Sequence, residues 1–195
     1  MGFIATLAFA QNPLISSDFS ADPTARVFEG RVYLYPSHDI PPVDHPNQRP
    51  DWFCMADYHC YSSVNLTDWT DHGVILDQKD VPWGNPEAYS MWAPDCVRGK
   101  DGRYYFYFPD APKPKDGAEK FRGFGIGVAI SDKPYGPFTA ETEPIKGTYG
   151  IDPCMLQAPD GNCYLFWGGG GIVQCKLKDN MLELDGAPER VNTIP

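Results

Sequence analysis

Hydrophobic and polar residues along this chain form short runs with a period of two, separated by turns rich in glycine, proline and aspartate. Such runs are typical of β-strands, and no segment keeps the 3.6-residue period of a helix. Three pairs of runs share one layout: a strand, a glycine turn and an aromatic second strand. The turn glycines are Gly30, Gly102 and Gly161, and the last two complete Asp-Gly pairs, which favour hairpin turns. The sequence therefore predicts three β-hairpins.

Each predicted hairpin is followed by a third strand, a polar turn and a weaker outer segment. The third strands are expected at residues 58–64, 124–131 and 171–177, and the outer strands of the first and third units within 72–76 and 178–184. Proline-rich insertions at 39–52 and 109–120 lengthen the first two units. Four antiparallel strands repeated in one order predict an all-β propeller, in which the first strand of each blade lines a central channel. A β-sandwich is the alternative, since it also uses short strands.

The amino-acid composition argues for some classes of protein and against others. The 195 residues include 5 Trp, 11 Tyr and 11 Phe, enough aromatic side chains for a substantial core. The 16 basic and 26 acidic residues give a net charge of −10. This charge argues against binding nucleic acid or an anionic membrane surface. It suits a neutral polar ligand such as a sugar, or simply keeps the protein soluble. No apolar run reaches the length of about 18 residues that a membrane span needs.

The N-terminus and the cysteines bear on the cell compartment. Residues 1–10 are largely apolar and end in Ala8-Phe9-Ala10, an A-x-A cleavage pattern. They are interpreted as the remnant of a secretory signal peptide, which predicts a secreted or periplasmic protein; a short apolar strand is the alternative. The six cysteines form no C-x-x-C pair, which argues against a zinc ribbon. Their even number permits disulfides in an exported chain without requiring them.

Two aspartates occupy equivalent places in the repeat. Asp22 and Asp152 each precede a proline at the start of a first strand. The second unit has Ala93 there, with Trp92 beside it and Asp95 two residues further on. In a propeller these residues converge at one mouth of the channel. Hydrolysis of a glycosidic bond needs two carboxyl groups, and an aromatic wall suits the apolar face of a sugar. The alternative is that Asp-Pro merely begins a turn.

These motifs resemble those of a known family, glycoside hydrolase family 43. The matching stretches cover nearly all of 18–184 in the family's order: ADPTARVFEGRVYLY, MADYHCYSSVNLTDW, MWAPDCVRGKDGRYYFYFP, GIGVAISDKPYGPF and GIDPCMLQAPDGNCYLFWGG. The resemblance implies a five-bladed β-propeller, of which this chain covers about three blades. Residues 11–195 would then be the N-terminal part of a truncated catalytic domain. The remaining blades would come from a missing C-terminal part or from a partner chain.

The resemblance also implies an activity and roles for residues. The expected enzyme hydrolyses arabinose- or xylose-containing plant polysaccharides with inversion, on arabinoxylan, arabinan or xylo-oligosaccharides. Asp22 would be the general base. Asp152 would raise the pKa of the general acid and orient it, because a nearby carboxylate disfavours ionisation of an acid. Trp92 would flank the sugar, although a core tryptophan between blades explains it too.

The general acid of the family is a glutamate of the fourth blade, which lies beyond this chain. Glu87 is expected in a loop before the second blade, Glu183 in the outer strand of the third blade, and Glu189 in a connection. None of them matches the motif of the acid. The chain is therefore expected to hold two of three catalytic carboxylates, and to be inactive alone.

Weaker candidates complete the expected site. His38, Asp39 and Asp57 follow strand ends and are candidates for binding substrate. No metal ligand is assigned and no cofactor is required. Some members of the family hold a structural calcium ion in the central channel. No acidic cluster in this sequence resembles a dedicated calcium loop. Two other functions stay open: a non-catalytic sugar-binding propeller, and a phosphorylase, which would need clustered arginine and histidine side chains that the sequence does not show.

Overall fold

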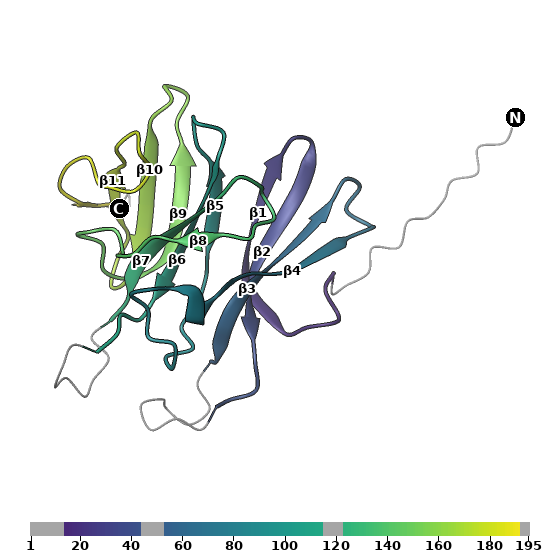
Figure 1. Cartoon of the computed structure of the whole chain (residues 1–195). Coiled ribbons are helices and arrows are strands. Elements are labelled where there is room, and N and C mark those ends of the chain that lie inside the picture. The colour runs from purple at the N-terminus through teal and green to yellow at the C-terminus, as the bar shows by residue number, and fades with distance from the viewer. Residues whose placement is uncertain (1–13, 44–52, 115–122, 192–195) are drawn as a thin grey trace, which may run out of the picture.

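The computed structural model describes residues 14–43, 53–114 and 123–191, and it places three four-stranded antiparallel sheets one after another along the chain (Figure 1). In each sheet the strands pair in sequence order. The first strands of neighbouring sheets, β1 with β5 and β5 with β9, lie in contact. This is the arrangement of three consecutive propeller blades, as predicted.

The bounds of the strands are as follows. Blade one contains β1 (Ser20–Phe28), β2 (Arg31–Asp39), β3 (Met55–Ser63) and β4 (Thr70–Asp77). Blade two contains β5 (Asp95–Arg98), β6 (Tyr104–Asp110), β7 (Gly125–Ser131) and β8 (Thr139–Ala140). Blade three contains β9 (Ile151–Gln157), β10 (Cys163–Gly168), β11 (Val173–Lys176) and β12 (Glu189–Arg190). A single turn of 3-10 helix, η1 (Gln78–Asp80), is capped by the Asp77 side chain.

The three predicted hairpins are confirmed. Gly30, Gly102 and Gly161 have φ angles of 77°, 85° and 82°, in the left-handed region that glycine adopts without steric cost. Each glycine lies between the first two strands of its blade. The aspartate-glycine turns therefore set the pairing of β5 with β6 and of β9 with β10.

The prediction for the outer strand of blade three was wrong. β12, at Glu189–Arg190, pairs with β11, whereas residues 178–184 form a loop held to the sheet by one bridge between Leu177 and Leu184. The loop follows from its anchors: Met181 is buried, and Tyr107 Oη donates a hydrogen bond of 2.9 Å to its carbonyl oxygen. Glu183 therefore lies in a loop and Glu189 in a strand, the reverse of the expectation.

Aromatic side chains fill the core on both faces of blade two. Along β6, Tyr104, Phe106 and Phe108 pack into the core shared with blade one, and Tyr105 and Tyr107 into the core shared with blade three. Successive side chains of a strand point to opposite faces, so a fully buried strand reads as a continuous apolar run. Blade two is thus the central layer of the described structure.

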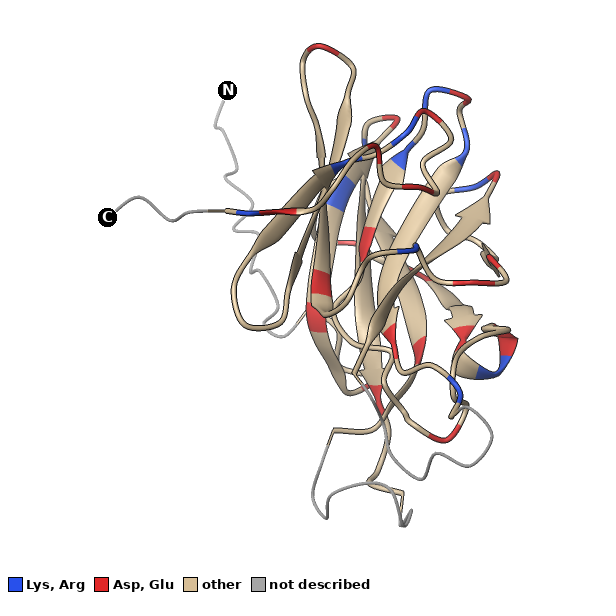
Figure 2. Ribbon diagram, turned by 90° about the vertical axis from the view of Figure 1, so that its left-hand side faces the viewer, with Lys and Arg blue, Asp and Glu red and all other residues tan. Residues whose placement is uncertain are grey.

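Basic and acidic residues are distributed differently over the described structure. In Figure 2 the basic segments concentrate on the turns at the upper end, while acidic segments occur over the whole ribbon. Several exposed cations have acidic partners, such as Lys100 with Asp179 at 3.0 Å and Lys178 with Glu183 at 2.6 Å. None of the helices in the described ranges is long and apolar enough to cross a membrane.

Two further sequence predictions concern the ends of the chain and the cysteines. Residues 1–10 lie outside the described residues, as do residues 44–52 and 115–120 of the two proline-rich insertions. None of the six cysteines forms a disulfide within the described structure, and all but Cys154 are buried. A buried thiol packs as a small hydrophobic residue, which accounts for most of these cysteines in or beside the strands.

Candidate functional site

The aspartates of the two Asp-Pro pairs lie in identical local structures. In blade one the pairing of β1 with β2 passes from Ala21–Ser37 to Thr24–Tyr35, so two residues of β1 oppose one of β2. In blade three the pairing passes from Gly168–Ile151 to Phe166–Cys154, with the same two-to-one count. Each aspartate is therefore the first residue of a β-bulge. Bulges redirect a side chain from the regular alternation of the strand and are frequent next to active sites.

The backbone at both aspartates is strained. Asp22 has a φ of 47° and Asp152 a φ of 56°, in the left-handed region that residues with a Cβ rarely adopt. Such strain costs of order 1–3 kcal/mol and persists only where the surrounding structure imposes it. The chain is also closely packed next to Asp152: a Cβ on Gly150, two residues earlier, would lie 1.7 Å from the carbonyl oxygen of Gly168. Both carboxylates are exposed.

Asp22 interacts electrostatically with two other predicted site residues, Asp39 and Asp152. Partial loss of hydration raises the pKa of Asp152, and the negative charge of Asp22 raises it further. The pKa of Asp39 is raised by the same two causes, while His38 opposes them. Asp22 is thus common to both interactions. The fold brings Asp22, Asp39 and Asp152 together from β1, β2 and β9.

Asp95 has a different role from the two strained aspartates. It is 2% exposed, and its carboxylate accepts hydrogen bonds from Arg26, from Thr24 Oγ1 at 2.9 Å and from the Met155 backbone nitrogen at 2.7 Å. These donors belong to β1 and β9, so Asp95 on β5 joins the inner strands of all three blades. Arg26 also donates to the Met155 carbonyl oxygen at 3.0 Å. Asp95 therefore holds the channel wall together, and is not free to act on a ligand.

Trp92 lies in the segment that leads into β5. Its ring packs against that of Phe124, with centroids 4.6 Å apart, and its carbonyl oxygen accepts a hydrogen bond of 2.6 Å from Tyr58 Oη. The residue is half-buried against the core of blades one and two. The structure therefore gives Trp92 a packing role, and its predicted role beside a sugar stays a prediction.

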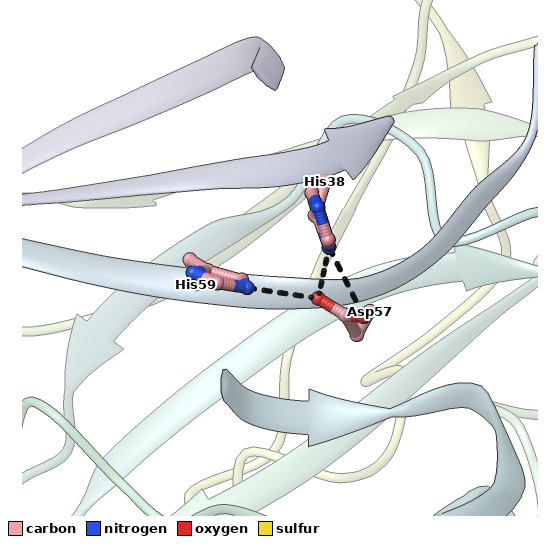
Figure 3. A group of neighbouring side chains, drawn as sticks. All are labelled: His38, Asp57 and His59. Carbon is pink, nitrogen blue, oxygen red and sulfur yellow. Dashed lines mark hydrogen bonds and ion pairs between the residues drawn. The ribbon is translucent and has the colours of Figure 1, made fainter. Parts of the chain in front are cut away.

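His38 and Asp57 form a second group with a residue that sequence reasoning missed (Figure 3). His38 Nδ1 lies 3.0 and 3.2 Å from the two carboxylate oxygens of Asp57, and His59 Nε2 lies 3.3 Å from Asp57 Oδ1. The Asp57 carboxylate raises the pKa of His59, against the effect of burial. Because Asp57 and His59 are two residues apart on β3, the strand period could have found this pair.

The three glutamates considered as a general acid lie on separate parts of the surface. Glu87 is exposed in the loop before blade two. Glu183 pairs with Lys178, which lowers its pKa, opposite to the shift that a general acid needs. Glu189 is exposed at the edge of blade three. The expectation that none of them replaces the missing acid stays in place.

The donor atoms near the channel offer little to a calcium ion. In the part of the chain that the structure describes, one group of His, Cys, Asp and Glu side chains has the spacing of metal ligands: His38, Asp57 and His59. Its two imidazole nitrogens do not suit calcium, which takes six to eight oxygen ligands. The structural calcium ion therefore stays a prediction without support from these residues.

Comparisons with known proteins identify the family over nearly the whole chain. The family model for glycosyl hydrolases family 43 matches residues 10–193. A xylosidase/arabinosidase 43A of Humicola insolens is 47% identical over 173 residues, covering 86% of this chain and 50% of that protein. A xylosidase/arabinosidase of Bacteroides ovatus is 44% identical over 180 residues, covering 90% and 52%. The chain thus spans about half the length of the curated relatives it matches.

A solved structure agrees with these relatives. It is the β-xylosidase/α-arabinofuranosidase CoXyl43 from a compost microbial metagenome, in complex with xylotriose. It superposes with a TM-score of 0.80 at 36% identity, covering 94% of this chain and 62% of that one. This confirms the propeller and makes the sandwich alternative wrong. The match of the family model over nearly all residues, with the repeated Asp-Pro bulges, shows that this chain belongs to glycoside hydrolase family 43.

Proposed function

We propose that this chain provides the water-activating half of a glycosidase site that cleaves xylose- or arabinose-containing polysaccharides with inversion. The observation that carries the proposal is that Asp22 and Asp152 lie at matched β-bulges, and that the charge of Asp22 acts on both Asp152 and Asp39. The relatives are named for xylosidase and arabinosidase activity, which supports the same substrate class.

In this proposal Asp22 acts as the general base. Its carboxylate is exposed at the mouth of the channel, where a water molecule can reach it. A carboxylate that accepts a proton from water raises the nucleophilicity of that water toward the anomeric carbon, as inverting hydrolysis requires. The fixed backbone of the bulge holds the base in one direction, so that the attack comes from one face of the sugar.

Asp152 and Asp39 are the supporting carboxyl groups. Partial burial and, after it, the charge of Asp22 raise the pKa of both, so each is more readily protonated than an isolated aspartate. In its ionised form Asp152 in turn raises the pKa of a general acid supplied at the other side of the sugar, because two like charges close together disfavour each other.

The proposal is tested with the protein expressed from its complete coding sequence. The substrates are 4-nitrophenyl β-xyloside, 4-nitrophenyl α-arabinofuranoside and xylotriose. Asp22→Asn is expected to reduce kcat by roughly 10²–10⁴-fold, the usual contribution of a general base. Asp179→Asn, which changes an exposed acid of blade three, serves as the matched control. Proton NMR of the first product is expected to show the inverted anomer.

Two results would contradict the proposal. Turnover by Asp22→Asn within a few-fold of the wild type would remove Asp22 as the base. Binding of xylotriose with no release of product by the wild-type protein would favour the non-catalytic sugar-binding alternative. A second readout does not depend on turnover: NMR titration of the Asp152 carboxyl should show a lower pKa in Asp22→Asn, because the negative charge that raises it has been removed.

A further inference from the structure

The His38, Asp57 and His59 side chains converge on one point of blade one (Figure 3). Tyr58 and Cys60, which alternate with Asp57 and His59 on β3, pack into the core shared with blade two. By the period of the strand, Asp57 and His59 therefore point to the opposite face. His38 joins them from β2, where it pairs directly with Asp57 in the register of the two strands.

The hydrogen bonds around His59 determine which ring nitrogen carries its proton. Tyr61 Oη donates to Asp18 Oδ2 at 3.2 Å, so its oxygen is left to accept from His59 Nδ1, 3.4 Å away. With the proton on Nδ1, a neutral His59 has a lone pair on Nε2. That nitrogen is buried and makes no hydrogen bond within the described structure, although it lies 3.3 Å from Asp57 Oδ1.

A positive charge is required between His59 Nε2 and Asp57 Oδ1, and it is either the proton of a charged His59 or a bound metal ion. A lone pair on His59 Nε2 and the negatively charged Asp57 Oδ1 repel each other when they face one another out of water. His38 Nδ1 completes the triangle, 3.0 Å from Asp57 Oδ1. The side chains of His38, Asp57 and His59 are 24%, 11% and 13% exposed, so the point between them is shielded but open on the His38 side.

The spacing and the kind of donor atom suit a transition metal. Zinc binds imidazole nitrogen and carboxylate oxygen at about 2.0–2.2 Å, so tetrahedral ligand atoms lie roughly 3.3–3.5 Å apart. Two of the three spacings here are 3.0 and 3.3 Å, and all lie within 4.8 Å. Two imidazoles and one carboxylate match zinc and its neighbours in the first transition row, whereas calcium and magnesium prefer oxygen alone.

We propose that His38 Nδ1, Asp57 Oδ1 and His59 Nε2 bind one divalent transition-metal ion of the zinc class. Tyr61 Oη accepts a hydrogen bond from His59 Nδ1 and so holds the ring and its tautomer, as carbonyl or carboxylate groups do at other zinc sites. The fourth position of the ion faces the exposed side of His38 and would hold water. The ion would link β2 to β3, and would lie next to Asp39, the following residue of β2.

Zinc titration tests the site directly in the 195-residue chain after treatment with a chelator. Calorimetry at neutral pH is expected to show saturable binding of one Zn²⁺ per chain. At a free concentration about 100 times the Kd, zinc should raise Tm by roughly 5–10 °C. His38→Gln, Asp57→Asn and His59→Gln should each weaken binding at least tenfold. His72→Gln is the matched control, since His72 lies on β4 of the same blade but outside the group.

Cobalt distinguishes this site from the free cysteines. Co²⁺ bound by nitrogen and oxygen gives visible absorption bands without the near-ultraviolet thiolate band that Cys154, exposed on blade three, would produce. Circular dichroism shows whether each variant is folded. If His59→Gln fails to fold, His38→Gln decides, because its side chain is the most exposed of the three.

The outcomes are distinct. Binding of one ion that the three variants lose and His72→Gln keeps supports the site. Absence of saturable zinc binding by the wild type overturns it and means that a proton on His59 Nε2 alone holds the Asp57 contact. A thiolate band, or binding unchanged in the three variants, also overturns it. Neither result depends on glycosidase activity, so the test is independent of the proposed catalytic function.

Discussion

Replacement of Asp95 by asparagine should destabilise the protein more than any other single carboxylate change among the described residues. The Asp95 carboxylate accepts bonds from Arg26, Thr24, the Cys96 backbone nitrogen and the Met155 backbone nitrogen. An asparagine of the same shape presents an amide NH₂ to at least some of these donors, where no bond can form. The Arg26 guanidinium also loses its buried counter-charge.

The magnitude follows from the burial of the pair. Breaking a buried ion pair by removing one partner costs about 3–5 kcal/mol, because the remaining charge is left uncompensated. Asp95 is 3% and Arg26 30% exposed at the side chain, so the lower half of that range applies best. For a chain of this size each kcal/mol lowers Tm by about 2–4 °C, which predicts a decrease of roughly 6–16 °C.

Urea unfolding followed by circular dichroism gives the free energy, and calorimetry gives Tm. The control is Asp179→Asn, whose partner Lys100 is exposed and which should leave Tm unchanged. Arg26→Met and the double variant complete a double-mutant cycle, in which the double variant should lose less than the sum of the single variants. A loss below about 1 kcal/mol in Asp95→Asn, or equal losses in Asp179→Asn, would refute the assignment of Asp95 as the junction of three blades.

Two further predictions concern buried groups of blades two and three. Burial raises the pKa of Asp110 to about 7, against hydrogen bonds from Ser90 Oγ and a backbone amide. The folded state therefore binds this proton more tightly than the unfolded state, whose pKa is near 3.8, and stability should fall by up to roughly 4 kcal/mol between pH 4 and 7. Urea unfolding across this range checks it: Asp110→Asn should remove the slope, and an unchanged slope would contradict the cause. Gly150→Ala should destabilise the protein by more than about 1 kcal/mol, because the added Cβ would meet the Gly168 carbonyl oxygen at 1.7 Å and φ is 145°; an alanine variant with the wild-type Tm would contradict it.

Local sequence patterns determined most of the fold. The period of two, the Asp-Gly turns and the repeated order of strands were sufficient for three blades, because hairpin pairing depends on neighbours in sequence. They were not sufficient for the outer strand of blade three. There two short segments compete for the edge of β11, and the burial of Met181, far along the chain from its partner Tyr107, decides between them.

For the site, the sequence alone determined that Asp22 and Asp152 occupy equivalent places, since the Asp-Pro repeat is visible in the letters. Only the tertiary structure decided which carboxyl groups act on each other. It coupled Asp39 to Asp22, buried Asp95 as a junction between blades, and brought His59 to His38 and Asp57. The physical reason is that charges interact through space: electrostatic coupling depends on distances between strands, and a strand pattern fixes the face on which a side chain lies but not its neighbour on the next strand.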